Sequence, residues 1–163
     1  LGRKNIAFVG NVDDGSPEFM NRFEGYSEAL QEAGLVVDDS TQRDAVNTED
    51  AGYDAAISLL ESKVKVDAIV VASDLIAAGV LNALQSSGLK VPEEIAIVGF
   101  DDIPVARYRQ PSLTTCREYC THAGVLLVDK LVELIKGEPM SNSFMKTDLI
   151  VRDSCGAKLK SKI

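Results

Sequence analysis

The sequence is poor in several residue types that would point to particular kinds of protein. Its 163 residues include no tryptophan, one histidine and three cysteines. An odd number of cysteines without a recognisable signal peptide favours a reducing cytoplasm over a disulfide framework. No apolar run reaches about 18 residues, so we expect no membrane-spanning segment. Lysine and arginine total 17 against 25 acidic residues, a net charge of −8, so we do not expect this chain to hold nucleic acid by itself.

The sequence does contain enough apolar residues, 45%, to form the core of one domain. Short apolar runs alternate with amphipathic segments of helical length. Strands are predicted at 5–10, 35–38, 66–72 and 94–100, with helices that begin near Ser16–Pro17, at Thr48 and at Leu75. Because the strands are apolar at nearly every position, we expect both faces of their sheet to be covered. The pattern predicts an α/β fold with a doubly wound, mostly parallel sheet.

The alternation of strands and helices changes after Pro111. Residues 112–118 read as an extended crossing, and residues 122–137 as a strongly apolar helix ended by Gly137. A last strand is predicted within 145–154, followed by a basic, frayed tail.

Few residues are suited to catalysis or to metal binding. A hydrolase would have to use His122, which lies far along the chain from any strained serine turn. Residues 10–16, "GNVDDGS", lack both the glycine spacing and the lysine of a phosphate loop. Cys116 and Cys120 with His122 and the distant Cys155 have poor zinc-ligand spacing. A phosphoacceptor receiver domain would need a lysine after its last strand. We therefore predict no enzyme activity, no cofactor and no metal.

Two charged residues are candidates for ligand binding. Ligands of open parallel sheets bind at the carboxyl ends of the strands, and Asp101 and Asp102 end the run "IAIVGF". Asp101 either caps the next turn or accepts hydrogen bonds from a ligand. Arg22 lies beside the apolar stripe from Phe19 to Tyr26, so it either snorkels to solvent or reaches over the sheet edge. A guanidinium and a carboxylate at one rim would suit the hydroxyls of a sugar.

Several segments, in order, resemble the effector-binding domain of the LacI/GalR family of bacterial transcription repressors. They are "SPEFMNRFEGYSEALQEAGL", "ASDLIAAGVLNAL", "GLKVPEEIAIVGFDD" and "PSLTT". The resemblance covers residues 2–155. It implies a fold of the type I periplasmic-binding-protein kind, with two lobes behind a helix-turn-helix head.

The resemblance also implies a division of this chain. Residues 1–112 correspond to the second, C-terminal lobe, and residues 113–137 to a crossover and a helix of the first lobe. Residues 138–155 return to the second lobe, and residues 156–163 form the tail. The head and most of the first lobe would lie outside this sequence. An alternative is a sugar-binding protein of a transport system with the same fold, which would carry an export signal instead of a DNA-binding head.

Particular residues take expected roles from this resemblance. Arg22 and Asp101 match the family's effector-contacting arginine and carboxylate, and Asp102 is expected to be structural. Ser73 stands where the family often has Asn or Asp, and Asn47 where several members stack an aromatic ring on the ligand. The ligand that the resemblance implies is a small effector, a sugar or sugar derivative. It would be bound by a cytoplasmic homodimer that reaches DNA only through its head. The dimer interface is expected at Leu75, Ala78, Leu81, Val105 and Tyr108, because helix 75–88 is apolar nearly all round.

Overall fold

The computed structural model describes residues 1–11, 16–139 and 141–160. Within them, a six-stranded sheet has the order β2-β1-β3-β4-β5-β6, parallel except for the β5–β6 pair. The strands are β1 (Ile6–Val9), β2 (Gln42–Arg43), β3 (Ala68–Val71), β4 (Ala96–Asp101), β5 (Thr114–Arg117) and β6 (Asp148–Ile150). The helices are α1 (Pro17–Glu32), α2 (Glu49–Glu61), α3 (Asp74–Ser86), α4 (Pro104–Tyr108), α5 (Cys120–Ile135) and α6 (Ala157–Lys160), with a 3₁₀ turn η1 (Asp39–Thr41). The predicted doubly wound, mostly parallel sheet is confirmed.

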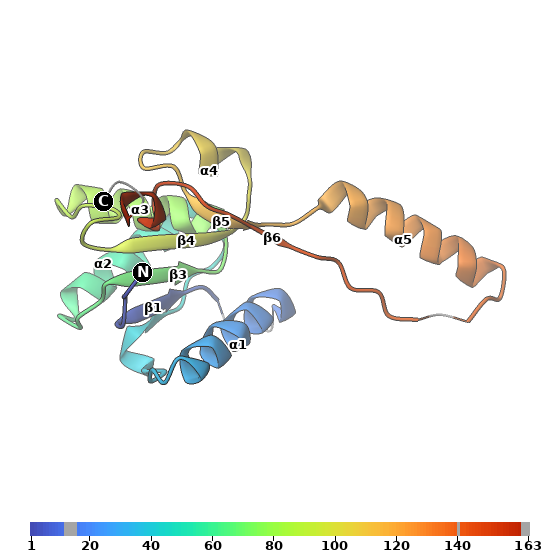
Figure 1. The fold of residues 1–163 in the computed structure, drawn as a ribbon, viewed down its shortest axis with the longest axis horizontal. Helices are drawn as coiled ribbons and strands as arrows, with labels where there is room; N and C mark the ends of the chain where they lie inside the picture. Colours follow the sequence, from blue (N-terminus) through green and yellow to red (C-terminus); the bar gives the residue numbers. More distant parts are fainter. Residues whose placement is uncertain (12–15, 140, 161–163) are drawn as a thin grey trace.

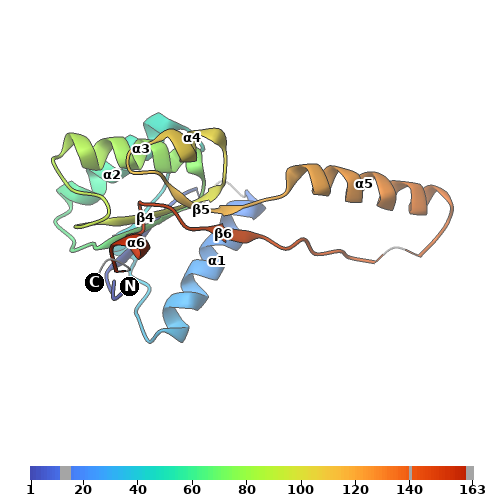
Figure 2. The same cartoon turned by 45° about the horizontal axis from the view of Figure 1, so that its top comes forward.

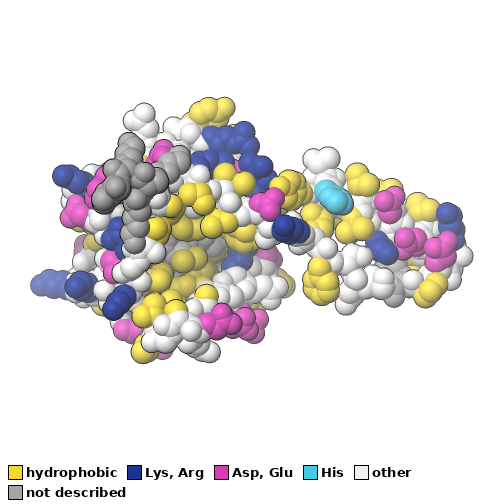
Figure 3. All heavy atoms as spheres, in the orientation of Figure 1, with side chains coloured by type: hydrophobic (Ala, Val, Ile, Leu, Met, Phe, Trp, Pro, Cys, Tyr) yellow, Lys and Arg dark blue, Asp and Glu magenta, His cyan; other side chains and the backbone are white. Residues whose placement is uncertain are grey.

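The two faces of the sheet are covered unequally. Helices α2 and α3 lie on one face and α1 lies on the other, as Figures 1 and 2 show. On the α1 side, Val70, Val98 and Cys116 are only half-buried, and Leu149 of the edge strand is exposed. Figure 3 shows hydrophobic side chains gathered in a hollow on the face above α1. This face therefore still offers apolar surface for a further element to cover.

Helix caps position the residues at the carboxyl edge of the sheet. The Thr48 hydroxyl accepts a hydrogen bond from the Ala51 amide at the start of α2, as the sequence predicts. The Ser73 hydroxyl does the same for Ile76 at the start of α3. Because α3 begins directly after β3, the polar Ser73 and Asp74 are fixed at the edge where ligands bind in such sheets.

The predicted second strand is wrong. Residues 35–38 form no strand, and the ladder partner of β1 is β2, through Phe8–Gln42 and Val9–Arg43. Leu35 and Val37 still pack against the core as partly buried side chains. Their apolar character reflects this packing and not a place in the sheet.

Helix α5 stands away from the rest of the chain as an arm (Figures 1 and 2). Not one of its residues is buried, although it is rich in leucine and valine. Leu127 is 70% exposed and Ile135 76%. The predicted tail includes the short helix α6, and residues 161–163 lie outside the described part. Residues 12–15 of the "GNVDDGS" segment also lie outside it.

Candidate functional site

Arg22 reaches from α1 over the carboxyl edge of the sheet. Its Nη1 donates a hydrogen bond to the Ala72 carbonyl at the end of β3, at 2.7 Å. Its guanidinium carbon lies 3.8 Å from the centre of the Phe100 ring, close enough for a cation–π interaction. The side chain is only 15% exposed. The sequence left open whether Arg22 extends into solvent or over the sheet edge, and in the structure it lies over the sheet edge.

Asp101 lies beside Arg22 at the end of β4. Its Oδ1 is 3.4 Å from Arg22 Nη2, and its backbone φ of 112° is in a region that residues with side chains rarely adopt. Burial raises the pKa of the Asp101 carboxyl to about 6, although the Arg22 charge lowers it. A carboxylate held in a strained conformation between strands is typical of a functional position.

A second carboxyl, Asp74, is buried behind Asp101 at the start of α3. Its Oδ2 accepts a hydrogen bond from the Ile103 amide at 3.0 Å. Burial raises its pKa to about 6, against the lowering effect of hydrogen bonds from Thr115 and Ile103. A Cβ at Gly99 would lie 2.3 Å from Asp74 Oδ1, so the glycine makes room for this carboxyl. Asp74 is fully buried and supports the turn instead of meeting a ligand.

Asp102 has the structural role that we expect for it, which it fulfils by forming salt bridges. Its carboxylate receives Arg117 Nε at 2.6 Å and the Arg152 guanidinium, and Arg107 lies 3.5 Å away. Burial raises its pKa, but the hydrogen bonds and charges of Arg152 and Arg117 outweigh burial and hold the pKa below its usual value. These contacts tie the end of β4 to β5 and to the segment after β6.

Ser73 and Asn47 lie together but differ in exposure. The Ser73 hydroxyl donates to Asn47 Oδ1 at 2.6 Å and caps α3. Ser73 is buried, so its side chain is occupied by the fold. Asn47 is exposed, so its side chain is accessible from solvent.

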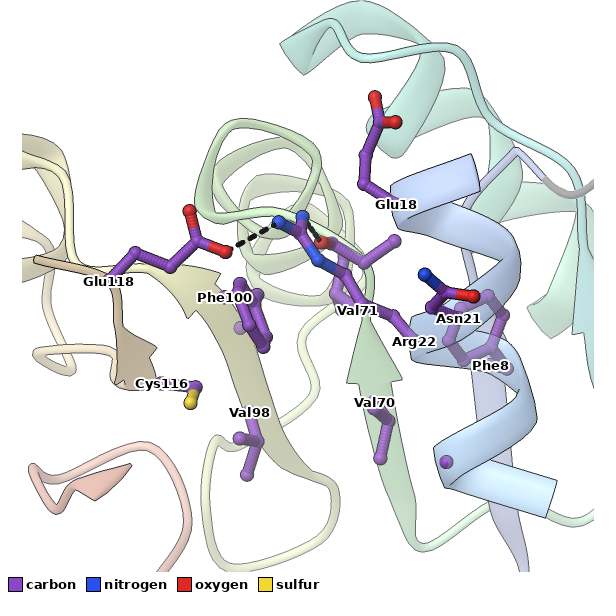
Figure 4. Close-up of a pocket in the computed structure, with 13 residues that line it drawn as sticks. Phe8, Glu18, Asn21, Arg22, Val70, Val71, Val98, Phe100, Cys116 and Glu118 are labelled. Atoms are coloured by element: carbon purple, nitrogen blue, oxygen red, sulfur yellow. Dashed lines mark hydrogen bonds and ion pairs between the residues drawn. The ribbon is translucent and has the colours of Figure 1, made fainter. Parts of the chain in front are cut away.

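A hollow of about 520 Å³ opens beside Arg22, between α1 and the sheet. Its rim carries Glu18, Arg22 and Glu118, and its floor includes Val98 and Phe100 (Figure 4). Glu118 Oε1 is 3.3 Å from Arg22 Nη2 (Figure 4). Phe100 and Glu118 were not predicted as site residues from the sequence. For Phe100 the signal was alternation, because Val98 and Phe100 share the strand face that points toward α1.

Other candidate sites are not assembled. Among the described residues, no three histidine, cysteine or carboxylate side chains come together as a metal site requires. His122 lies on α5, and the three cysteines are free thiols. Helices of the described chain are all too short or too polar to cross a bilayer.

The residues expected at a dimer interface are divided by burial. Ala78 and Leu81 are each 1% exposed, since α3 packs against α2 and α4. Leu75 and Val105 are partly exposed and Tyr108 is 82% exposed. The expected apolar outer face of α3 is therefore largely covered within this chain, and pairing stays a prediction.

The doubly wound sheet, with polar residues at the carboxyl ends of its strands, defines the class: a lobe with the fold of the periplasmic binding proteins. A family model for the periplasmic binding protein-like domain matches residues 1–155. The chain belongs to this family, in the form found in LacI-type transcription regulators.

Individual relatives agree with this assignment. The transcriptional regulator CelR of Thermobifida fusca is 34% identical over 155 residues, which are 94% of this chain and 45% of that protein. The solved complex of CelR with cellobiose has a TM-score of 0.86 at 34% identity, covering 94% of this chain and 47% of that one. The lac repressor dimer bound to operator and an anti-inducer has a TM-score of 0.89 at 26% identity, covering 94% and 53%. The chain thus spans less than half the length of CelR.

Proposed function

We propose that this chain is the effector-sensing lobe of a LacI-type bacterial transcription regulator and has no enzymatic activity. It binds a small sugar or sugar derivative at the carboxyl edge of the sheet through Arg22, Asp101 and Asn47, with Ser73 holding Asn47 in place. The observation that carries the proposal is the Arg22 guanidinium, stacked on Phe100 and paired with Asp101 at the carboxyl edge of the sheet. The related CelR, whose solved complex contains cellobiose, supports a sugar as the ligand class.

The geometry suits a ligand with several hydroxyl groups. Arg22 offers donors in a planar fork, and the Asp101 carboxylate accepts hydrogen bonds from hydroxyls. The Phe100 ring fixes the guanidinium from one side, which reduces the side-chain entropy that binding would otherwise cost. A ligand here would meet groups that the fold already holds in place.

Effector binding would act by moving two lobes relative to one another. We assign residues 1–112 to the second lobe, residues 113–137 to a crossover that packs into the first lobe, and residues 138–155 to the return. The exposed apolar surface of α5 supports this division, because such a helix needs a partner to cover it. Closure around the effector would shift a two-state equilibrium that a separate DNA-binding head reads. The regulator would work in the cytoplasm as a homodimer.

Calorimetry on the full-length regulator tests this function. Arg22→Ala and Asp101→Ala should each weaken effector binding roughly ten- to a hundredfold, because each removes a charged hydrogen-bonding partner. Glu61→Ala, on the exposed end of α2, serves as the control and should leave affinity unchanged. Wild-type affinity in both site variants would show that the effector binds elsewhere.

A further inference from the structure

We propose that Glu118 makes this pocket selective for uncharged or amine-bearing polyols and against anionic ligands such as sugar phosphates and sugar acids. The inference rests on the proposed function, because it names the ligand class of that same site.

The rim of the hollow carries more negative than positive charge. Among the described residues that line the hollow, Arg22 is the one cation, whereas Glu18 and Glu118 are acidic. Asp101 adds a third carboxyl, 3.4 Å from the guanidinium. Three acidic groups around one cation leave an excess of two negative charges when all are ionised. Burial raises the pKa of Asp101 to about 6, so Asp101 is still mostly ionised at neutral pH.

The two terminal nitrogens of Arg22 are already paired. One nitrogen, Nη1, donates to the Ala72 carbonyl at 2.7 Å, and the other, Nη2, faces both Glu118 and Asp101. One face of the guanidinium lies on the Phe100 ring. A phosphate or carboxylate binds an arginine best through two parallel hydrogen bonds from its guanidinium. Here such an anion would have to displace Glu118 from Nη2 while lying close to two other acids. A hydroxyl can instead donate to a carboxylate, and an ammonium can pair with one.

Glu118 is the acid of the three whose charge is least involved in holding the fold together. Its side chain is 41% exposed, against 28% for Asp101, and its hydrogen bond and ion pair are with Arg22. Asp101 also accepts a hydrogen bond from the backbone of Asp74 and has a strained backbone. Glu118→Gln therefore removes a charge while keeping an oxygen in reach of Arg22, with little expected effect on folding. Glu118 is the acid whose charge can be tested cleanly.

The experiment compares matched ligands on the full-length regulator by calorimetry. Each neutral sugar of a panel, including glucose and cellobiose, is measured beside its amino, phosphate and acid derivatives at constant ionic strength. In the wild type, the neutral or amino member should bind at least tenfold more tightly than the anionic member of its set. Glu118→Gln should narrow this ratio at least threefold, and Glu61→Gln should leave it unchanged.

The outcomes separate this inference from the proposed function. The selectivity role of Glu118 would be wrong, and the sugar site would stand, if the anionic member bound as tightly as the neutral one or more tightly. It would also be wrong if Glu118→Gln left the ratio of the two affinities unchanged. Neutral binding that survives Arg22→Ala would overturn the proposed site itself. A panel in which no member binds would overturn both.

Discussion

At the scale of single residues, Asp101 combines two properties that a ligand-binding carboxylate needs. It faces the pocket arginine, and burial raises its pKa to about 6. The ionised form is the better acceptor for ligand hydroxyls. As the pH rises through about 6, Asp101 loses its proton and its capacity to accept increases. Effector affinity should therefore depend on pH in a range where most carboxylates no longer titrate.

We predict that effector affinity increases about tenfold from pH 5 to pH 7 and then levels off, as expected for a single carboxyl that must be ionised for binding. Calorimetry across this range measures the dependence. Asp101→Asn should weaken binding and flatten the profile. Asp74→Asn is the matched control, since the pKa of Asp74 is also raised to about 6 but its side chain is fully buried. If the inflection persists in Asp101→Asn and disappears in Asp74→Asn, the pH dependence of binding belongs to Asp74 and the prediction is wrong.

At the scale of elements, helices α2 and α3 approach each other through glycines. A Cβ at Gly79 would lie 1.8 Å from the Glu49 carbonyl oxygen, and one at Gly52 would lie 2.2 Å from the Ile76 carbonyl oxygen. Both obstacles are backbone atoms, which cannot move without shifting a helix. Around this crossing, Arg109 joins the two helices, donating to Glu49 at 2.7 Å and to Asn82 at 3.2 Å. The crossing thus holds α3, and with it the start of α3 at the site, against the sheet.

Gly79→Ala should lower the free energy of unfolding by about 1–3 kcal/mol, because overpacking forces backbone shifts. Gly124→Ala in α5 is the control. A Cβ there has nothing within 4 Å, so the change should be neutral or slightly stabilising through helix propensity. Urea denaturation of both variants provides the measurement. Equal stability of Gly79→Ala and the wild type would mean that the helices separate at little cost.

How far the sequence predicts these elements depends on what each residue contacts. Strands β3 and β4 were predictable because apolar residues occupy both of their faces and are at least partly buried on each. Strand β2 was not, because Gln42 and Arg43 join the sheet through backbone atoms and carry no apolar signal. Arg22 could be found from its place beside an apolar stripe. Glu118 could not, because it reaches Arg22 only once β5 lies beside β4, and that neighbour relation is a property of the whole sheet.

At the scale of the whole molecule, two apolar surfaces lie outside the core of this chain besides the sheet face above α1. One is the set of Leu75, Val105 and Tyr108 around α3 and α4. The other is the arm α5, which exposes Val125, Leu127, Val128, Leu131, Val132, Leu134 and Ile135 to between 41% and 76%. Because Ala78 and Leu81 are buried, the first surface is smaller than the sequence indicated. The arm therefore offers the larger apolar area for association of this chain by itself.

We predict that the 163-residue chain forms homodimers at micromolar concentration and that α5 dominates their interface. Sedimentation equilibrium measures the association. Leu131→Asp should shift the chain to monomer, because it places a charge in the apolar contact, which is costly without a partner. Tyr108→Asp is the matched variant on the other surface and should leave the dimer intact. Ala78 is unsuitable as a probe, since a charge at this buried position would unfold the chain. A wild-type monomer would refute the prediction. Dissociation by Tyr108→Asp alone would place the interface at α3 and α4, where the resemblance to the LacI/GalR family puts it, and would leave α5 to be covered by another part of the whole regulator.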